Sequence, residues 1–172
     1  KIWNMKHELG ILKDRVVDWD GVEQNVGLSD NKKTAQYIAN KSVTLVKNQN
    51  SLVPLKPSKL KDITHLILTT DDDANSFLKI LDRDLKRTHR NVKRIFINEE
   101  LSQNRISSIV EDLKSSSVVV VSMLIRIRMD KGESTIHGTH ALLLERLKEE
   151  GIPTVGISFG SPYLPSYDSL DA

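Results

Sequence analysis

The sequence contains no cysteine, little excess charge and no long apolar run. Without cysteine the chain can form no disulfide, no thiolate zinc site and no cysteine nucleophile. Its 25 basic and 23 acidic residues nearly balance, so no general electrostatic attraction toward nucleic acid is expected. No apolar stretch approaches the roughly 20 residues that span a bilayer, and the amino terminus has no apolar signal core. We therefore expect neither a nucleic-acid partner nor a membrane span.

The densest basic run, residues 86–94, lies between an expected helix and an expected strand. No aromatic residue is interleaved with its lysines and arginines, so nucleic-acid bases would have nothing to stack on. We interpret this run as a solvated connection.

Hydrophobic periodicity predicts an α/β fold over most of the chain. Strands are expected at residues 63–68, 92–97, 117–125 and 153–159, and helices at 74–85, 106–113 and 141–147. Four consecutive valines, Val118–Val121, are typical of a central strand that is buried on both faces. This alternation predicts a three-layer α/β/α sandwich with a mostly parallel sheet, flavodoxin-like or Rossmann-like, and right-handed crossovers.

The first part of the chain follows a different pattern. Apolar residues between Ile2 and Leu12 recur at helical spacing, and a second helix is expected to begin at Ser29 or Asp30, either of which can cap it. Alternating apolar residues within 43–55 predict a small hairpin. We expect residues 1–28 to be a linker or extension and residues 29–172 to be the α/β domain, continuing past Ala172 with one more strand.

Ligands of parallel sheets bind beyond the carboxyl ends of the strands, so the loops there are the places to look for a site. The loop 126–138 carries Arg126 and Arg128 directly after the most buried strand, and Glu133 follows in the same loop. Guanidinium groups at this place can donate to sugar hydroxyls or to an acidic substituent. We predict that Arg126 and Arg128 bind substrate, with a solvated loop as the alternative.

Asp71–Asp73 imitate the acidic residues that hold magnesium in phosphoacceptor receiver domains. That chemistry also needs an aspartate at the end of a middle strand and a lysine at the end of the last one. Ser122 stands in the middle strand, and no lysine follows the last strand. We expect the three aspartates to cap a helix and to place favourable charge at its amino terminus.

Two further motifs have ordinary structural explanations. Ser158 lies in a Gly-x-Ser-x-Gly match, but prolines follow it and no histidine comes later, so we expect a small residue in a buried strand. His137 and His140 stand three residues apart without a third ligand arranged beside them, so a loop or capping role is expected and no metal site. Dinucleotide and phosphate-loop fingerprints are absent, and no cofactor is expected.

Two segments together resemble a known family. The stretch KSVTLVKNQNSLVPLK, residues 41–56, and the stretch GISFGSPYL, residues 156–164, resemble segments of family 3 glycoside hydrolases in the same order and at a similar spacing. KHELGIL, residues 6–12, resembles the close of that family's barrel domain. The resemblance covers nearly the whole chain and points to the second, C-terminal α/β sandwich domain of enzymes of the β-N-acetylglucosaminidase or β-glucosidase type.

The resemblance implies a retaining, exo-acting reaction on terminal β-linked sugars, which needs a carboxylate nucleophile and an acid/base. In the family the nucleophile is an aspartate of a TIM barrel, which this chain lacks. The acid/base is either a glutamate of the second domain, for which Glu133 is the candidate here, or an Asp-His pair of a barrel loop. We favour the second arrangement, in which this chain holds no catalytic residue.

We therefore expect an accessory domain that is inactive alone, packs on the barrel of the same polypeptide and possesses no cofactor. Its substrate would be a carbohydrate, and the family resemblance favours a periplasmic or secreted location. The alternative is a free-standing module with a Rossmann-like sheet that binds a small ligand or a carbohydrate. An independent enzyme that uses Ser158 or Glu133 is the remaining possibility.

Overall fold

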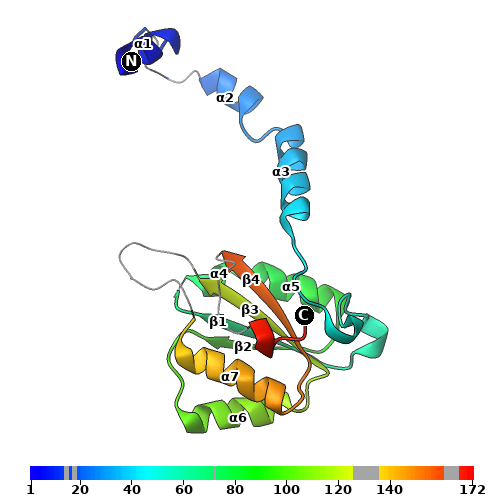
Figure 1. Ribbon diagram of the computed structural model, residues 1–172. Helices are drawn as coiled ribbons and strands as arrows, with labels where there is room; N and C mark the ends of the chain where they lie inside the picture. The colour runs from blue at the N-terminus through cyan, green and yellow to red at the C-terminus, as the bar shows by residue number, and fades with distance from the viewer. Residues whose placement is uncertain (14–15, 17–18, 72, 126–135, 161–166) are drawn as a thin grey trace. The chain divides into compact units, whose positions relative to one another are not determined.

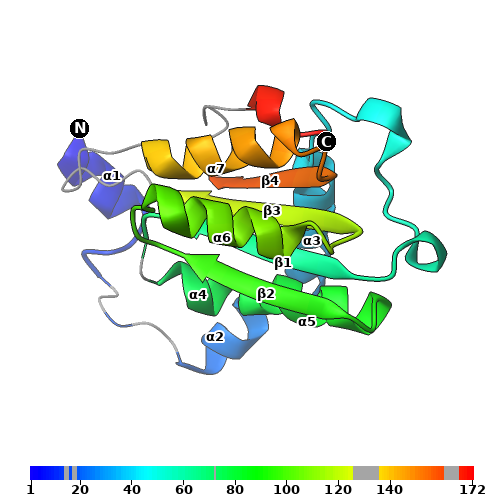
Figure 2. The same ribbon diagram turned by 90° about the horizontal axis from the view of Figure 1, so that it is seen from below.

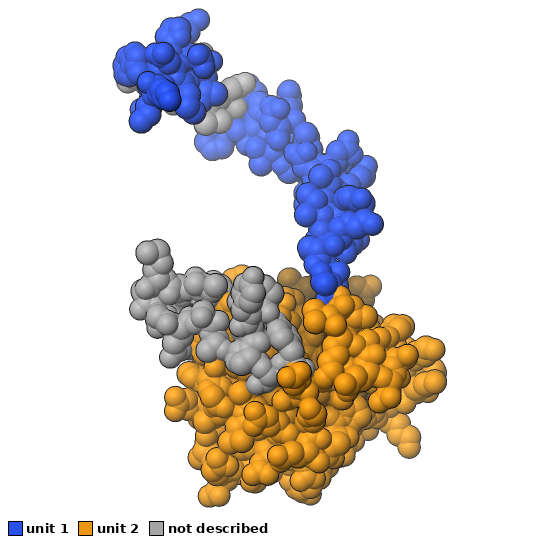
Figure 3. All heavy atoms as spheres, in the orientation of Figure 1, with its two compact units in different colours: residues 1–44 blue, residues 45–172 orange. Residues whose placement is uncertain are grey.

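The computed structural model describes residues 1–13, 16, 19–71, 73–125, 136–160 and 167–172. The chain forms two compact units, Lys1–Thr44 and Leu45–Ala172 (Figure 3). The helix that begins at Ser29 belongs to the first unit. Among the described residues, none of the helices is both long and apolar enough to cross a bilayer.

The first unit consists of three helices: α1 (Ile2–Glu8), α2 (Trp19–Asn25) and α3 (Ser29–Ser42). The helices expected near the amino terminus and from Ser29 are thereby confirmed. None of the residues in these three helices is buried. The expected cap of α3 is wrong, because Leu28 holds the N-cap position and the Asp30 carboxylate pairs with Lys33 at 2.8 Å.

The second unit is built on four parallel strands in the order β2-β1-β3-β4 (Figures 1 and 2). The strands are β1 (Ile63–Thr69), β2 (Val92–Ile97), β3 (Val118–Ile125) and β4 (Thr154–Gly160). The helices are α4 (Ala74–Phe77), α5 (Lys79–Thr88), α6 (Gln103–Leu113) and α7 (Gly138–Glu149). The predicted α/β sandwich is confirmed, and the strand order is that of the flavodoxin-like alternative.

Helices cover both faces of the sheet, with α6 and α7 on one face and α4 and α5 on the other (Figures 1 and 2). Because side chains of a strand alternate between faces, β1 and β3 supply both layers of the core. The larger apolar cluster includes residues of the sheet and of α6 and α7: Leu66, Val121, Met123, Ile106, Leu113, Leu143 and Leu147. Alternate strand residues, Ile63, Val118 and Val120, form the second cluster with Val155 of β4.

The expected hairpin within residues 43–55 is not formed, since this stretch contains no strand and instead a 3-10 turn, η1 (Gln49–Ser51). A side chain replaces the partner strand. The side-chain Nδ2 of Asn48 donates to the backbone carbonyl of Val53 at 2.8 Å. The backbone amide of Val53 donates back to Oδ1 of Asn48 at 2.9 Å. The later apolar residues of this stretch, Leu52, Val53 and Leu55, pack on the second cluster of the sheet.

The last described residues lie along β4 after a further 3-10 turn, η3 (Tyr167–Ser169). The amide of Ala172 donates to the carbonyl of Thr154 at 3.2 Å, and the amide of Gly156 donates to the carbonyl of Ala172 at 2.6 Å. This pair of bonds is the pattern of parallel strands. Leu170 packs beside Gly156, where a Cβ would lie 2.3 Å from its Cδ1, so only glycine leaves room for it.

Candidate functional site

The residues predicted to bind substrate, Arg126 and Arg128, and the candidate acid/base, Glu133, lie outside the described residues. They follow β3, which pairs with β1 at the centre of the sheet. The connection that follows β1 leads to β2 on one side of it, and the connection that follows β2 leads to β3 on the other side of β1. The strand order therefore reverses between β1 and β3, and ligands of parallel sheets bind at such a reversal. The roles of these three residues stay predictions.

The loop after β1 lies at this point, and hydrogen bonds order its start. The Thr69 hydroxyl donates to the carbonyl of Leu124 at 2.6 Å and accepts from the amide of Asp71 at 3.0 Å. Asp71 is buried, and its Oδ1 accepts from the amide of Asp73 at 3.3 Å. The Asp71 carboxylate thus orders the turn that enters α4. The expected helix cap is not formed, since Asp73 holds the N-cap position of α4 without a side-chain capping bond.

His137 and His140 stand at the start of α7, with their rings edge to face at 4.9 Å between centroids. His140 is fully buried, and its Nε2 lies 2.8 Å from the carbonyl of Glu99. The hydroxyl of the neighbouring Thr139 accepts from the amide of Leu101 at 3.0 Å. Burial lowers the pKa of His140, so the neutral ring donates through Nε2. These bonds tie the loop after β2 to α7, which supports the expected loop role.

The described part of the chain holds no group of three or more histidine, aspartate or glutamate side chains arranged to bind a metal ion. Ser158 lies within the continuous strand β4, paired in register with Met123 of β3. A nucleophile elbow needs a sharp turn at the serine. Ser158 is therefore an ordinary strand residue, as expected, but it is half-buried and not fully buried as its sequence context predicts.

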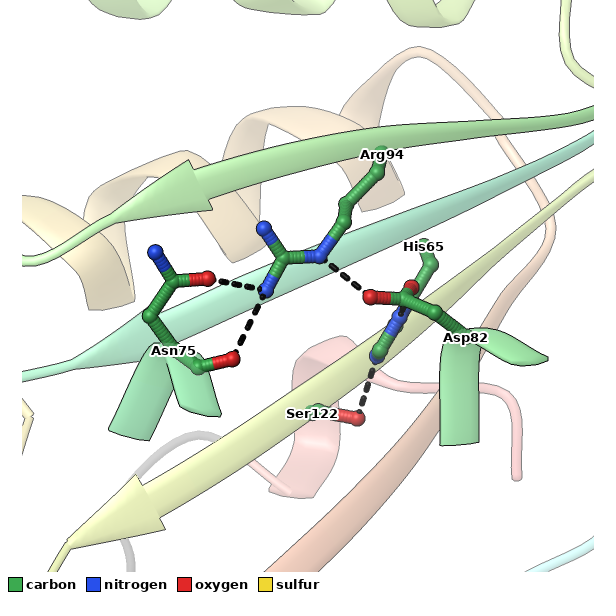
Figure 4. A network of polar contacts seen from close by, with 5 residues as sticks. All are labelled: His65, Asn75, Asp82, Arg94 and Ser122. Atoms are coloured by element: carbon green, nitrogen blue, oxygen red, sulfur yellow. Dashed lines mark hydrogen bonds and ion pairs between the residues drawn. The ribbon is translucent and has the colours of Figure 1, made fainter. Parts of the chain in front are cut away.

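A buried network of polar side chains is the most developed constellation of the described residues (Figure 4). His65 Nε2 lies 2.7 Å from the hydroxyl of Ser122, and His65 Nδ1 lies 2.5 Å from Asp82 Oδ1. Asp82 Oδ2 forms an ion pair with Nε of Arg94, without the alignment of a hydrogen bond. Arg94 Nη2 donates to Asn75 Oδ1 at 2.7 Å.

The elements that carry this network explain why it forms. His65 of β1 lies beside Arg94 of β2 in the sheet register, and both face the layer of α4 and α5. Asp82 is the buried position of α5 and points at the sheet (Figure 4). Buried polar groups need partners, and the Asp82 carboxylate supplies a hydrogen-bond acceptor to His65 and an opposite charge to Arg94 where α5 meets the sheet.

The protonation of His65 follows from its surroundings. Burial lowers the pKa of His65, although the hydrogen bond and charge of Asp82 act in the opposite direction. A carboxylate only accepts hydrogen bonds, so the neutral ring donates from Nδ1 to Asp82 and accepts at Nε2 from the Ser122 hydroxyl. The ring and the ion pair of Asp82 with Arg94 together are then electrically neutral.

The order serine, histidine, aspartate is that of a hydrolytic triad. Here His65 and Ser122 have no exposed surface and Asp82 is 6% exposed. Ser122 also lies in the middle of β3 rather than on a turn. A substrate cannot reach this serine, so the network serves to hold α5 on the sheet.

Sequence reasoning missed the network, because His65, Asp82 and Arg94 were not singled out. One signal was present: His65 and Ser122 are polar residues inside strands whose neighbours predict burial on both faces. Such residues require a partner from another element. Which helix residue supplies that partner depends on how α5 is placed on the sheet, which the sequence pattern does not specify.

Known structures share this fold. A β-glucosidase from Listeria innocua, in complex with isofagomine, superposes with a TM-score of 0.71 at 18% identity over 98% of this chain. The β-glucoside phosphorylase BglX superposes with a TM-score of 0.59 at 21% identity over 92% of this chain. A fungal multi-domain GH3 β-N-acetylglucosaminidase superposes with a TM-score of 0.60 at 18% identity over 91% of this chain. No family model matches the chain, and no curated protein matches it by sequence.

The match covers only part of each of these larger proteins. The chain spans 26% of the β-glucosidase, 29% of the phosphorylase and 17% of the β-N-acetylglucosaminidase. The expected resemblance to one domain of family 3 glycoside hydrolases is thereby confirmed at the level of the fold.

Proposed function

We propose that this chain is the accessory α/β domain of a retaining, exo-acting glycoside hydrolase of family 3. The parent enzyme would remove terminal β-linked N-acetylglucosamine or glucose. The observation that carries the proposal is the extent of the structural match, which takes in 98% of this chain and about a quarter of a β-glucosidase. A domain of this size in such an enzyme leaves the greater part of the catalytic machinery to the rest of the polypeptide.

Within the second unit, the described parts of the two segments that resemble the family are joined through the last residues of the chain, which supports the proposal. The Lys47 ammonium donates to the carbonyl of Leu170, and the amide of Gln49 donates to the carbonyl of Asp171 at 2.8 Å. Asp171 in turn accepts from the amide of Thr154 at the start of β4. The amide of Gly156 also donates to the carbonyl of Ala172 at 2.6 Å. Residues 47–49 of the first segment and Gly156 of the second are thus linked through the last residues of the chain, as expected for parts of one structural unit.

Exposed apolar side chains support a partner for this chain. Trp3 and Trp19 of the first unit are 68% and 81% exposed, and Val16 is 83% exposed. Large apolar side chains that their own unit leaves uncovered, when they gather in a patch, mark a surface for another body. We assign that body to the barrel domain of the same polypeptide.

The assignment of the nucleophile to the barrel agrees with the carboxylates described here. Asp71 and Asp82 are the buried acidic residues among those the structure describes. Asp71 orders the turn before α4, and both oxygens of Asp82 are engaged by His65 and Arg94. We therefore propose that this domain contributes packing and, through Arg126 and Arg128, contacts with the sugar.

The coding region on both sides of these 172 residues tests the proposal. A barrel-length segment in the same reading frame upstream is the expected result. Start and stop codons that bound only this domain would contradict it, and would favour a free-standing binding module.

A further inference from the structure

A pocket with a volume of about 510 Å³ is lined by residues of α5 and by Arg94 of β2. Among the described residues, the six that line it are all charged: Lys79, Asp82, Arg83, Lys86, Arg87 and Arg94. Asp82 is buried and Arg94 half-buried, so these two form the floor, while the other four are exposed. The pocket was not evident from the sequence, because the run 86–94 omits Lys79 and Arg83.

The floor of the pocket is electrically neutral, because Arg94 forms an ion pair with Asp82. Asn75 binds Arg94 as well, so the guanidinium is held in one orientation (Figure 4). The four remaining cations stand at the positions 79, 83, 86 and 87 of one helix, which share one face. The pocket therefore presents a strong excess of positive charge.

One nearby carboxylate opposes this excess only weakly. Asp84 lies 3.5 Å from Arg83 and 3.9 Å from Arg87, and all three side chains are more than half exposed. Exposed ion pairs of this kind contribute little and are easily exchanged for another anion. Arg83 and Arg87 thus remain able to bind an anionic ligand.

The arrangement of the cations indicates the kind of anion. From Lys79 to Arg87 the helix rises about 12 Å, which is too long for a single oxyanion and suits several anionic groups along a chain. Among the described residues, no aromatic or aliphatic residue lines the pocket, so nucleic-acid bases find no aromatic ring to stack on there and lipid chains find no apolar residue. Rows of lysine and arginine without aromatic residues fit sulfated polysaccharides of the heparin type.

We propose that this pocket binds an acidic polysaccharide, a carbohydrate chain whose sugars carry sulfate or phosphate esters. The inference does not require the proposed function, because the pocket is complete within the second unit. In a glycoside hydrolase it would hold a charged part of the polymer away from the bond that is cleaved.

Isothermal titration calorimetry at low ionic strength tests the proposal with the full 172-residue chain. The probes are a fully sulfated heparin octasaccharide, a phosphorylated mannan oligosaccharide of similar length, an uncharged oligosaccharide and a single-stranded oligonucleotide. Binding of at least one charged oligosaccharide is expected, and its Kd should rise steeply with salt because exposed charges are screened. Comparison of the two charged probes identifies the preferred ester.

The double variant Lys79→Gln/Arg83→Gln should raise the Kd of the bound oligosaccharide about tenfold, since two charge-assisted contacts are lost. The double variant Lys59→Gln/Lys61→Gln is the control, because it removes the same charge from exposed positions of the second unit outside the pocket. In this control variant the Kd of the same oligosaccharide should change less than about twofold. Equal losses in both variants, no binding of either charged oligosaccharide, or tighter binding of the oligonucleotide would each overturn the proposal.

Discussion

His65 Nδ1 lies 2.5 Å from Asp82 Oδ1, which joins the central strand β1 to helix α5 beneath the surface. The same carboxylate pairs with Arg94 of the edge strand β2 (Figure 4). Asp82 is therefore the member of the network on which the other two depend. Its removal leaves a buried imidazole N–H and a half-buried guanidinium without their shared acceptor.

We predict that Asp82→Ala lowers the free energy of unfolding by about 3 kcal/mol, because it breaks a largely buried ion pair and a buried hydrogen bond. Asp84→Ala is the matched control, two residues along the same helix, where the carboxylate is half-exposed and pairs with exposed arginines. It should change stability by less than about 0.5 kcal/mol. Urea denaturation measures both, and equal effects would show that the network contributes nothing to stability.

The pH dependence of stability should follow from the buried histidines. Burial lowers the pKa of both His65 and His140 in the folded chain, while the unfolded chain keeps values near 6.5. Below about pH 6.5 the unfolded state therefore binds more protons than the folded state, and stability falls as the pH is lowered further. Above that pH both states carry neutral rings and this contribution is fully present.

Urea midpoints measured between neutral and mildly acidic pH check this expectation. His140→Gln keeps an amide donor for the carbonyl of Glu99 but cannot be protonated, so its midpoint should fall less steeply with acid. A wild-type midpoint that stays constant or rises on acidification would refute the assignment of neutral buried rings.

Gly156 should not tolerate a side chain. Alanine there places Cβ 2.3 Å from Leu170 Cδ1, and we expect a loss of about 1–3 kcal/mol from overpacking. Gly138→Ala is the control, since a methyl group at that position would have no neighbouring atom within 4 Å. In Gly156→Ala/Leu170→Ala the clash is removed, so the double variant should be more stable than the sum of the single losses predicts. Additive losses in thermal unfolding would argue against this contact.

The sheet and its helices could be predicted from the sequence, because strands such as Val118–Ile125 are apolar on both faces and regularly separated by helical periods. The hairpin was wrong for a specific reason. The alternating residues, Val43 and Leu45, are 81% and 60% exposed, so their alternation does not mark a strand with one buried face. Leu52, Val53 and Leu55 do pack against the sheet, but the side chain of Asn48, and not a partner strand, bonds the backbone of Val53.

The candidate site was predictable only in part. Motif reasoning placed Ser158, His137 and His140 in structural roles, which their contacts support. The network of His65, Asp82 and Arg94 joins two strands and a helix, and no spacing within the sequence encodes how far α5 is rotated on the sheet. The cations of the pocket do follow a helical spacing, from Lys79 to Arg87, but the position of Arg94 beside them depends on the same placement of α5.

The central claim is that these residues do not assemble an active site by themselves. Its most direct test is the hydrolysis of p-nitrophenyl β-N-acetylglucosaminide and p-nitrophenyl β-glucoside by the purified chain. We predict no release of p-nitrophenol above the buffer rate at any protein concentration. Turnover that increases with the amount of chain, above all turnover that Glu133→Gln or Ser158→Ala abolishes, would contradict the claim.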